Sequence, residues 1–365
     1  MNYNVLIEEF CEVYKLGKVK AIKLFSTGVA NQTYMVELTE NSGSKGSNAS
    51  KYVIKAINPS SYESGEAIRR LEVTEYISEL ANKNGVTSVL AKKIKGNVIN
   101  NLKGQYYIVF EYCEGKIIAL NNITVEHCFE IGQMLAKIHN TNFEELLTSE
   151  VKADVRSYNY GSKRKTKIDW NKYLLKLSQS NSSPQWIERF EELIPDLYKM
   201  FDLTFSPAIS FVPQDVLISH TDFNNHNVLW KDGVPHFIDW ERACFIDATY
   251  DCLFSAMRWA TKNRPKSKDD YSALDKDRLY AFFDGYIEKR CINTDTIKDC
   301  LHIIIFRKLL YLKANLKKYL DVEDDIETKR VDEVIVFTLY ILKDYINLLT
   351  DLENITNYIY FRMSI

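Results

Sequence analysis

The chain has 365 residues, of which 46% are hydrophobic, enough for two domains or one two-lobed unit and too apolar for a disordered chain. Its 47 Lys and Arg residues against 49 Asp and Glu residues leave a formal charge of −2. We therefore expect no global field that attracts nucleic acid or a membrane surface. The seven cysteines are scattered and form no C-x-x-C pair, which excludes a disulfide framework or a zinc site and favours free thiols in a reducing compartment.

The amino-terminal segment, "MNYNVLIEEFCEVYKLGKVK", carries acidic residues inside its apolar stretch and has no small-residue cleavage site. It does not resemble a signal peptide. No uninterrupted apolar run approaches the roughly 18 residues of a membrane span. These features predict a cytoplasmic protein that acts on neither membranes nor nucleic acid.

The first 112 residues predict a sheet with one helix. Four segments rich in β-branched and aromatic residues read as strands, at 19–26, 32–40, 51–57 and 105–112. The Gly-, Ser- and Asn-rich segment 41–50 predicts a flexible hairpin loop. Residues 65–83 carry apolar side chains at helical spacing, and Asn84-Gly85 supplies a stop signal.

The remaining chain is mostly helical in pattern. Residues 125–140 predict a helix capped by Thr124, and a helix-leaning stretch covers about 168–201. After short strands near 216–240, helices dominate from Tyr250, most clearly at 301–320 and 331–359. The pattern predicts an α+β, two-lobed fold: a small β-rich lobe at 1–112, a connector near 111–115 and a larger helical lobe at 113–365, with a ligand cleft expected between the lobes.

Short polar side chains are concentrated in "ISHTDFNNHNVLWKDGVPHFIDWERA", residues 218–243. His220, Asp222 and Asn227 form H-x-D-x-x-x-x-N, and Asp239 follows twelve residues later. "NVLW" and "HFIDW" read as strands around the turn signal "KDG", so a hairpin should bring Asn227 and Asp239 together. Both side chains offer hard oxygen ligands that suit Mg²⁺. Asp222, on the preceding loop, is placed to orient or accept a hydroxyl proton.

These segments resemble the aminoglycoside phosphotransferase and choline kinase family, which has a protein-kinase-like fold. H-x-D-x4-N followed by I-D-W is similar to the catalytic and metal-binding segments of that family. "FEIGQMLAKIHNTNF", "DATYDCLFSAM", "TGVANQTYMVEL", "YVIKAI" and "FEYCEG" also resemble family segments, in the family's order. The resemblance covers most of the chain and implies an ATP- and Mg²⁺-dependent kinase whose acceptor is the hydroxyl of a small molecule.

The resemblance also implies roles at the nucleotide site. Lys55 in "YVIKAI" is expected to hold the α- and β-phosphates, and helix 65–83 is expected to supply its acidic partner. Glu72 is the preferred partner and Glu75 the rival, because spacing does not separate them. Gly28 and Asn31 fall in the segment that resembles the phosphate loop. Gly28 alone stands where protein kinases carry three glycines.

Further roles follow for the hinge and the catalytic loop. Glu111 to Cys113 are expected to bind adenine through backbone groups. Asp222 is the expected catalytic residue, and Asn227 and Asp239 are the expected Mg²⁺ ligands. His220 is expected to pack beneath the loop rather than to take part in catalysis.

Asp251 is expected to brace the catalytic loop by accepting backbone N–H bonds. Several departures point away from a protein kinase: Thr221 replaces an arginine, Trp240-Glu241 replaces a Phe-Gly pair, and no activation segment fits between Asp239 and Asp247. A non-enzymatic protein, similar to spore-coat members of the same fold, is a second alternative. The full set of Lys, Asp, Asn and Asp residues favours the enzyme.

The acceptor stays open between an aminoglycoside or other antibiotic, choline, homoserine and a sugar-like alcohol. The segment "DVEDDIET", residues 321–328, offers acidic side chains for a polycation, whereas the preceding helix is basic. That helix carries Arg307, Lys308, Lys313, Lys317 and Lys318. A basic face lining the site would favour a neutral or anionic acceptor. Arg258 and Arg307 could reach a substrate, although helix packing explains them equally well.

Overall fold

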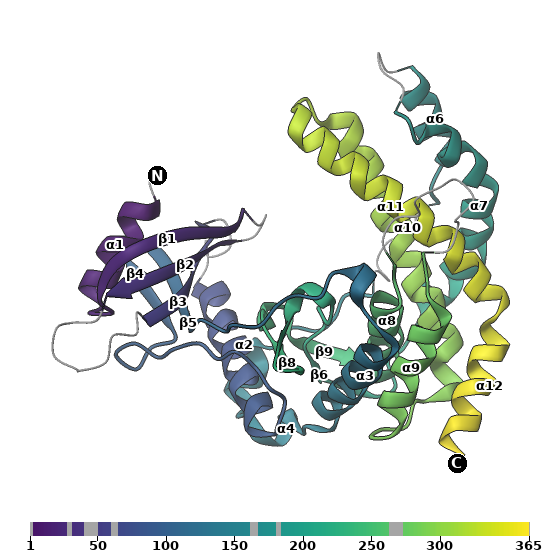
Figure 1. The fold of residues 1–365 in the computed structure, drawn as a ribbon. Helices are drawn as coiled ribbons and strands as arrows, with labels where there is room; N and C mark the ends of the chain where they lie inside the picture. The colour runs from purple at the N-terminus through teal and green to yellow at the C-terminus, as the bar shows by residue number, and fades with distance from the viewer. Residues whose placement is uncertain are drawn as a thin grey trace. The chain divides into compact units, whose positions relative to one another are not determined.

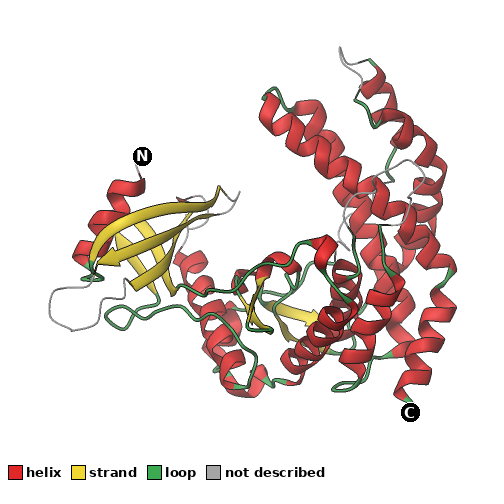
Figure 2. Cartoon of the chain, in the orientation of Figure 1, coloured by secondary structure: helices red, strands yellow, loops and turns green. Residues whose placement is uncertain are grey.

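The computed structural model describes residues 3–27, 31–39, 50–59, 65–160, 167–179, 184–262 and 273–364. Strands are gathered in the amino-terminal region and helices dominate the rest, which confirms the expected α+β class (Figure 2). The chain divides into two compact units, and each is discontinuous. The first unit comprises residues 1–118, 141–156 and 220–244, and the second comprises 119–140, 157–219 and 245–365. The first unit therefore includes residues 141–156 and 220–244, beyond the lobe at 1–112 that the sequence predicts.

The first unit is built on a five-stranded antiparallel sheet in the order β1-β2-β3-β5-β4 (Figure 1). Its strands are β1 (Lys18–Thr27), β2 (Asn31–Thr39), β3 (Ser50–Ile57), β4 (Ile99–Leu102) and β5 (Gln105–Glu111). Its other elements are α1 (Tyr3–Val13), α2 (Gly65–Lys83), α4 (Phe143–Leu146), α5 (Ser149–Asp154), η3 (Asn225–Asn227), β7 (Val228–Lys231), β8 (Val234–Phe237) and η4 (Trp240–Arg242). The four predicted strands are confirmed, whereas α1 and β4 were not predicted. The predicted loop at 41–50 lies almost entirely outside the described residues.

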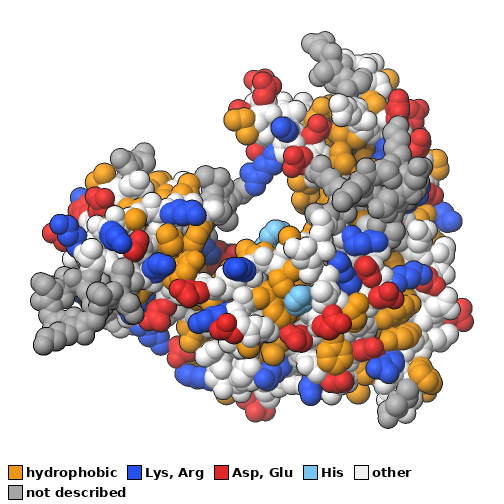
Figure 3. All heavy atoms as spheres, viewed as in Figure 1, with side chains coloured by type: hydrophobic (Ala, Val, Ile, Leu, Met, Phe, Trp, Pro, Cys, Tyr) orange, Lys and Arg blue, Asp and Glu red, His pale blue; other side chains and the backbone are white. Residues whose placement is uncertain are grey.

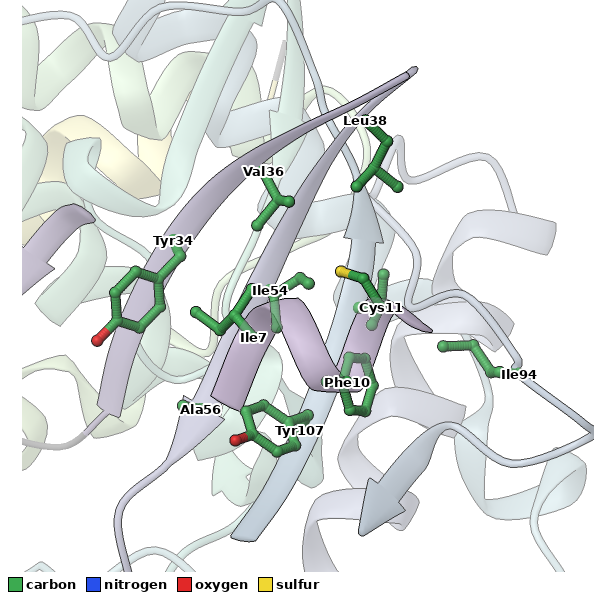
Figure 4. Packing of buried hydrophobic residues seen from close by; sticks show 11 residues of the cluster. Ile7, Phe10, Cys11, Tyr34, Val36, Leu38, Ile54, Ala56, Ile94 and Tyr107 are labelled. Atoms are coloured by element: carbon green, nitrogen blue, oxygen red, sulfur yellow. The ribbon is translucent and has the colours of Figure 1, made fainter. Parts of the chain in front are cut away.

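One face of this sheet is covered by α1 (Figure 4). Ile7, Phe10 and Cys11 recur at intervals of three and four residues, so they share one face of the helix and are fully buried. They pack on alternate residues of the central strands, among them Tyr34 and Ile54, which pair directly across β2 and β3. This alternation of inward-facing apolar residues fixes the register of β2 and β3, and the register sets the position of Lys55 on β3.

The other face packs against α2. Ile57, Ile99 and Ile108 form a second buried cluster, with Ile68 and Leu71 of α2 against it. The bounds predicted for this helix, 65–83, are those observed. Because α2 also packs against η4, it links the sheet to the end of the hairpin within the first unit.

The second unit is mainly helical (Figure 1). Its elements are η2 (Leu120–Asn122), α3 (Val125–Asn140), α6 (Trp170–Ser178), α7 (Ile187–Ser210), β6 (Val216–Ser219), β9 (Cys244–Asp247), α8 (Ala248–Trp259), α9 (Lys276–Ile287), η5 (Thr294–Thr296), α10 (Ile297–Asp321), α11 (Asp325–Thr350) and α12 (Leu352–Met363). The predicted cap of α3 is confirmed, since the His127 N–H donates to Thr124 Oγ1 at 3.3 Å. The stretches predicted at 168–201 and 331–359 each divide into two helices.

Two glycines allow α3 and α9 to pack closely. A Cβ on Gly132 would lie 2.1 Å from the Phe282 carbonyl oxygen, and a Cβ on Gly285 would lie 2.0 Å from the Phe129 carbonyl oxygen. Any side chain at either position would force the helices apart. The contact therefore depends on glycine on both helices.

Acidic and basic side chains are interspersed on the molecular face seen in Figure 3, in keeping with the small net charge. None of the described helices combines the length and apolar character that a bilayer crossing requires.

Candidate active site

The predicted hairpin at residues 227–239 is confirmed. Val228 pairs with Phe237 and Lys231 with Val234, which leaves a two-residue turn at Asp232-Gly233. Both turn residues have positive φ, 51° and 79°, as a type I′ turn requires. The Ile238 N–H donates to the Asn227 carbonyl at 3.0 Å, so the two ends of the hairpin are held together beside Asp239.

The Asp222 carboxylate is held in place by two amides. Asn224 Nδ2 donates to Asp222 Oδ1 at 3.1 Å, and Asn227 Nδ2 donates to Asp222 Oδ2 at 3.1 Å. Both amides also donate to the Asp222 carbonyl. Asp222 itself is half-buried, whereas both asparagines are buried. The aspartate is therefore oriented before any substrate arrives, which a residue that positions a hydroxyl requires.

His220 supports this loop from below, as the sequence predicts. The side chain is fully buried and packs on Trp240 with the ring centroids 4.7 Å apart. Its Nε2 lies 3.0 Å from the Ile238 carbonyl oxygen, and its Nδ1 lies 3.4 Å from the Asp222 amide. A neutral ring with its proton on Nε2 satisfies both contacts. The imidazole thus joins the loop to the hairpin.

Lys55 lies on β3 and faces two carboxylates of the η4 segment. Its Nζ is 2.9 Å from Asp239 Oδ1 and 2.6 Å from Glu241 Oε1. The Lys55 side chain is only 13% exposed, whereas that of Asp239 is 42% exposed. Burial alone would lower the pKa of the Lys55 ammonium, but the charges of Glu241 and Asp239 outweigh burial and raise it. The ammonium therefore stays protonated throughout the physiological range.

Glu75, and not Glu72, lies at this cluster. Glu72 is exposed on α2, so the preference for it was wrong, whereas Glu75 is 7% exposed. Burial raises the pKa of the Glu75 carboxyl to about 8; Lys55 opposes this rise, while Glu241 and Asp239 add to it. Glu75 is thus the acidic group of α2 whose pKa is influenced by the charge of Lys55.

Asn31 contacts a carboxylate and a backbone amide, and its expected place in the phosphate loop stays a prediction. Its Nδ2 lies 3.0 Å from both carboxylate oxygens of Glu241, and its Oδ1 accepts the Asn58 N–H at 2.9 Å. The side chain thus links the start of β2 to the carboxylate that holds Lys55. Gly28, the other residue expected in the phosphate loop, lies outside the described residues.

Glu111 and Cys113 follow the end of β5. Glu111 is exposed, with its carboxylate 3.6 Å from the Lys92 ammonium, and Cys113 is half-buried. Between them, the Tyr112 N–H donates to the Lys51 carbonyl at 3.2 Å. This segment is expected to bind adenine through its backbone groups, which these contacts do not test. Adenine binding at this segment therefore stays a prediction.

Asp251 belongs to the second unit and does not act as the sequence suggests. Its carboxylate accepts the Ser219 hydroxyl at 2.6 Å and lies 3.1 Å from His139 Nε2. His139 Nδ1 lies 2.7 Å from the Tyr286 hydroxyl. Asp251 therefore bonds side chains rather than the expected backbone amides. The aspartate and histidine side chains are fully buried, which fits a structural role in the core.

The donor set at the end of the hairpin fits Mg²⁺. Asn227 and Asp239 provide an amide oxygen and an exposed carboxylate, both hard ligands. Within the described ranges, no three His, Cys, Asp or Glu side chains converge into a complete metal cage. A two-ligand protein set suits Mg²⁺, which keeps several waters and binds substrate phosphates.

Glu241 is a site residue that the sequence analysis did not assign. It contacts both Lys55 and Asn31 and sits two residues after Asp239. A local signal existed: a carboxylate two residues after an expected metal ligand can reach the same site when the chain turns sharply. Asp239 makes that turn, with φ 65° and ψ 61° in the left-handed region.

The chain belongs to the phosphotransferase enzyme family designated APH, whose model matches residues 21–286. No curated protein sequence matches the chain. The fold is similar to that of spectinomycin phosphotransferase APH(9)-Ia, solved with ADP and spectinomycin, with a TM-score of 0.65, 13% identity, and 95% of this chain and 98% of that chain covered.

Two further solved structures share the fold. Amicoumacin kinase hAmiN, solved in complex with AMP-PNP, Ca²⁺ and Ami, has a TM-score of 0.58 at 14% identity, and the match covers 96% of each chain. Choline kinase from Cryptosporidium parvum has a TM-score of 0.56 at 13% identity and covers 97% of each chain. These likenesses confirm the expected kinase-like fold.

Proposed function

We propose that the protein transfers the γ-phosphoryl group of ATP to a hydroxyl group of a small molecule in a Mg²⁺-dependent reaction. The observation that carries this proposal is the Asp222 carboxylate, whose two oxygens are each held by an asparagine amide. Family membership supports the reaction type, and the nucleotides in the solved relatives support ATP as the donor.

Asp222 is the residue that orients the acceptor hydroxyl and takes its proton as the new phosphate ester bond forms. Its orientation is already set by Asn224 and Asn227, so little reorganisation is needed at the moment of reaction. Asn227 thus has two functions, since its Nδ2 holds Asp222 and its Oδ1 is the proposed metal ligand.

Lys55 and the carboxylates around it carry charges that suit the binding of phosphate and of a metal ion. Three carboxylates, from Glu75, Asp239 and Glu241, act on a single ammonium. When ionised, these carboxylates outnumber the ammonium, and a divalent cation would relieve the excess negative charge. Asp239 is the more exposed of the two carboxylates that pair with Lys55. Lys55 holds the α- and β-phosphates as a point charge. Asn227 and Asp239 would hold Mg²⁺, which would neutralise negative charge on the phosphates.

A small acceptor is favoured over a protein. Only Trp240–Arg242 and one further residue separate Asp239 from β9, so the hairpin leads directly into the next strand without an activation segment. Spectinomycin, amicoumacin and choline, named with the solved relatives, are the first acceptors to test. Homoserine and sugar-like alcohols complete the set.

An ADP-release screen tests the proposal. The protein is assayed with Mg²⁺ and ATP against aminoglycosides, spectinomycin, choline, homoserine and neutral, amino and acidic sugars. At least one acceptor class should stimulate ADP release, and Mg²⁺ with ADP should raise the melting temperature. Absence of both effects would contradict the proposal and favour a non-enzymatic protein of this fold.

A further inference from the structure

The residues that follow the expected adenine-binding segment lie against β7, inside the first unit. Lys116 and Trp230 pair as in an antiparallel sheet, since the N–H of each donates to the carbonyl of the other at 2.9 Å. Gly115 permits this close approach, because a Cβ there would lie 2.8 Å from the Leu229 Cβ and 3.1 Å from the Leu229 carbonyl carbon. A larger residue at this position would push the segment away from β7. The adenine-binding segment therefore continues directly onto the hairpin.

Asn225 adds a side-chain bond to the same segment. Its Nδ2 donates to the Ile118 carbonyl oxygen at 3.0 Å, although the two residues are 107 positions apart. Asn225 is only 7% exposed, so loss of its amide would leave that carbonyl without a donor in a place that water reaches poorly. The Asn225 carbonyl accepts the Val228 N–H at the start of β7. Asn225 is thus held both by its side chain and by its backbone.

Asn225 lies between the two asparagines that hold Asp222. The Asn224 and Asn227 amides donate to opposite oxygens of the Asp222 carboxylate. The Asn227 N–H also donates to the Asn224 carbonyl at 3.0 Å, so the three asparagines share one tight turn. A displacement of Asn225 would therefore move both amides. The bond to Ile118 thus bears on the orientation of the Asp222 carboxylate.

We propose that Asn225 is a positioning residue that joins the adenine-binding segment to the catalytic loop. The connection is short, because Lys116 follows Cys113 by only three residues in the sequence. A nucleotide bound at 111–113 and the Asp222 carboxylate would then keep a fixed distance, as phosphoryl transfer between aligned groups requires. This role rests on the proposed function, because it aligns the donor nucleotide with the group that takes the proton of the acceptor.

Kinetics of Asn225→Ala test the positioning role. The single-turnover rate at saturating substrates should fall about tenfold or more, while the KM values for ATP and the acceptor stay within about twofold, as expected when a reacting group is misplaced. Gly115→Ala should give the same split, because its Cβ would displace the same segment from β7. His226→Ala, at the exposed neighbour of Asn225, is the matched control and should keep the wild-type rate.

A second measurement needs neither phosphoryl transfer nor a folded variant. Adenosine, which carries no phosphate to hold a metal ion, should slow amide hydrogen exchange of the wild-type protein at 111–118. It should also slow exchange at 222–227, because segments joined by these hydrogen bonds open together. In Asn225→Ala, the slowing should be confined to 111–118.

The outcomes separate this role from the proposed function. Slowing at 111–118 alone in the wild type, or an undiminished single-turnover rate in Asn225→Ala, would overturn the positioning role and leave the kinase reaction intact. If adenosine slows exchange at neither segment, the nucleotide site at 111–113 is refuted, and the positioning role falls with it. Linked slowing in a protein that phosphorylates no acceptor would support the connection and contradict only the reaction.

Discussion

The buried carboxyl of Glu75 should make the free energy of unfolding depend on pH, and Glu75→Gln should remove this dependence. Its pKa rises from the ordinary 4.5 to about 8, chiefly through burial. A carboxyl whose pKa is higher in the folded state contributes stability that is complete below about pH 4.5 and is lost as the pH rises through the folded pKa. Glu75→Gln replaces the carboxyl with a neutral group of the same shape. The variant should therefore lose this part of the pH dependence.

The magnitude follows from the pKa rise. One pKa unit corresponds to about 1.4 kcal/mol. Between about pH 5 and about pH 8, the free energy of unfolding of the wild type should fall relative to Glu75→Gln by at most about 4 kcal/mol. Lys55 opposes the effect of burial, so the coupled cluster sets the final size. The sign is fixed: the glutamine variant gains relative stability as the pH rises.

The assay is urea-induced unfolding at several pH values, with Glu72→Gln as the matched control. Glu72 is exposed three residues away on the same helix, so its substitution should leave the pH dependence unchanged. A stability difference between wild type and Glu75→Gln that stays constant across this pH range would refute the reasoning. An equal pH dependence of the free energy of unfolding in Glu75→Gln and Glu72→Gln would also refute it.

Other substitutions should separate binding from packing. Glu241→Gln removes a charge 2.6 Å from Lys55. The steady-state KM for ATP should therefore change several-fold, while the KM for the acceptor is preserved. Equal changes in both KM values would argue against a local role of Glu241. Gly132→Ala should destabilise the protein by about 1–3 kcal/mol because the new methyl meets the Phe282 carbonyl. Gly65→Ala, where a Cβ meets nothing within 4 Å, should be neutral in the same thermal melts; equal losses would contradict the packing argument.

Local patterns were enough to predict much of the fold. Alternating apolar residues gave four strands, and the Asp232-Gly233 turn gave the hairpin because its backbone requirement is met within two residues. The helix α1 carried a readable signal as well, since Ile7, Phe10 and Cys11 share one face.

The contacts within the site could not be predicted in the same way. Glu72 and Glu75 are three residues apart on one helix, and only the packing of α2 on η4 buries the second of them. The bond between Asn31 and Glu241 joins residues 210 positions apart, which no local spacing reveals. Asp251 was expected to accept backbone N–H bonds, but it bonds the side chains of Ser219 and His139 because α3, β6 and α8 meet around it.

The central claim is tested most directly by following radiolabelled γ-phosphate from ATP into an acceptor under single-turnover conditions. Asp222→Asn should lower the rate by at least about a hundredfold, the scale of a positioned general base, while Mg²⁺ with ADP still raises the melting temperature. Asp232→Asn, the same change at the exposed hairpin turn, should transfer phosphate at the wild-type rate. Undiminished transfer by Asp222→Asn would contradict the account.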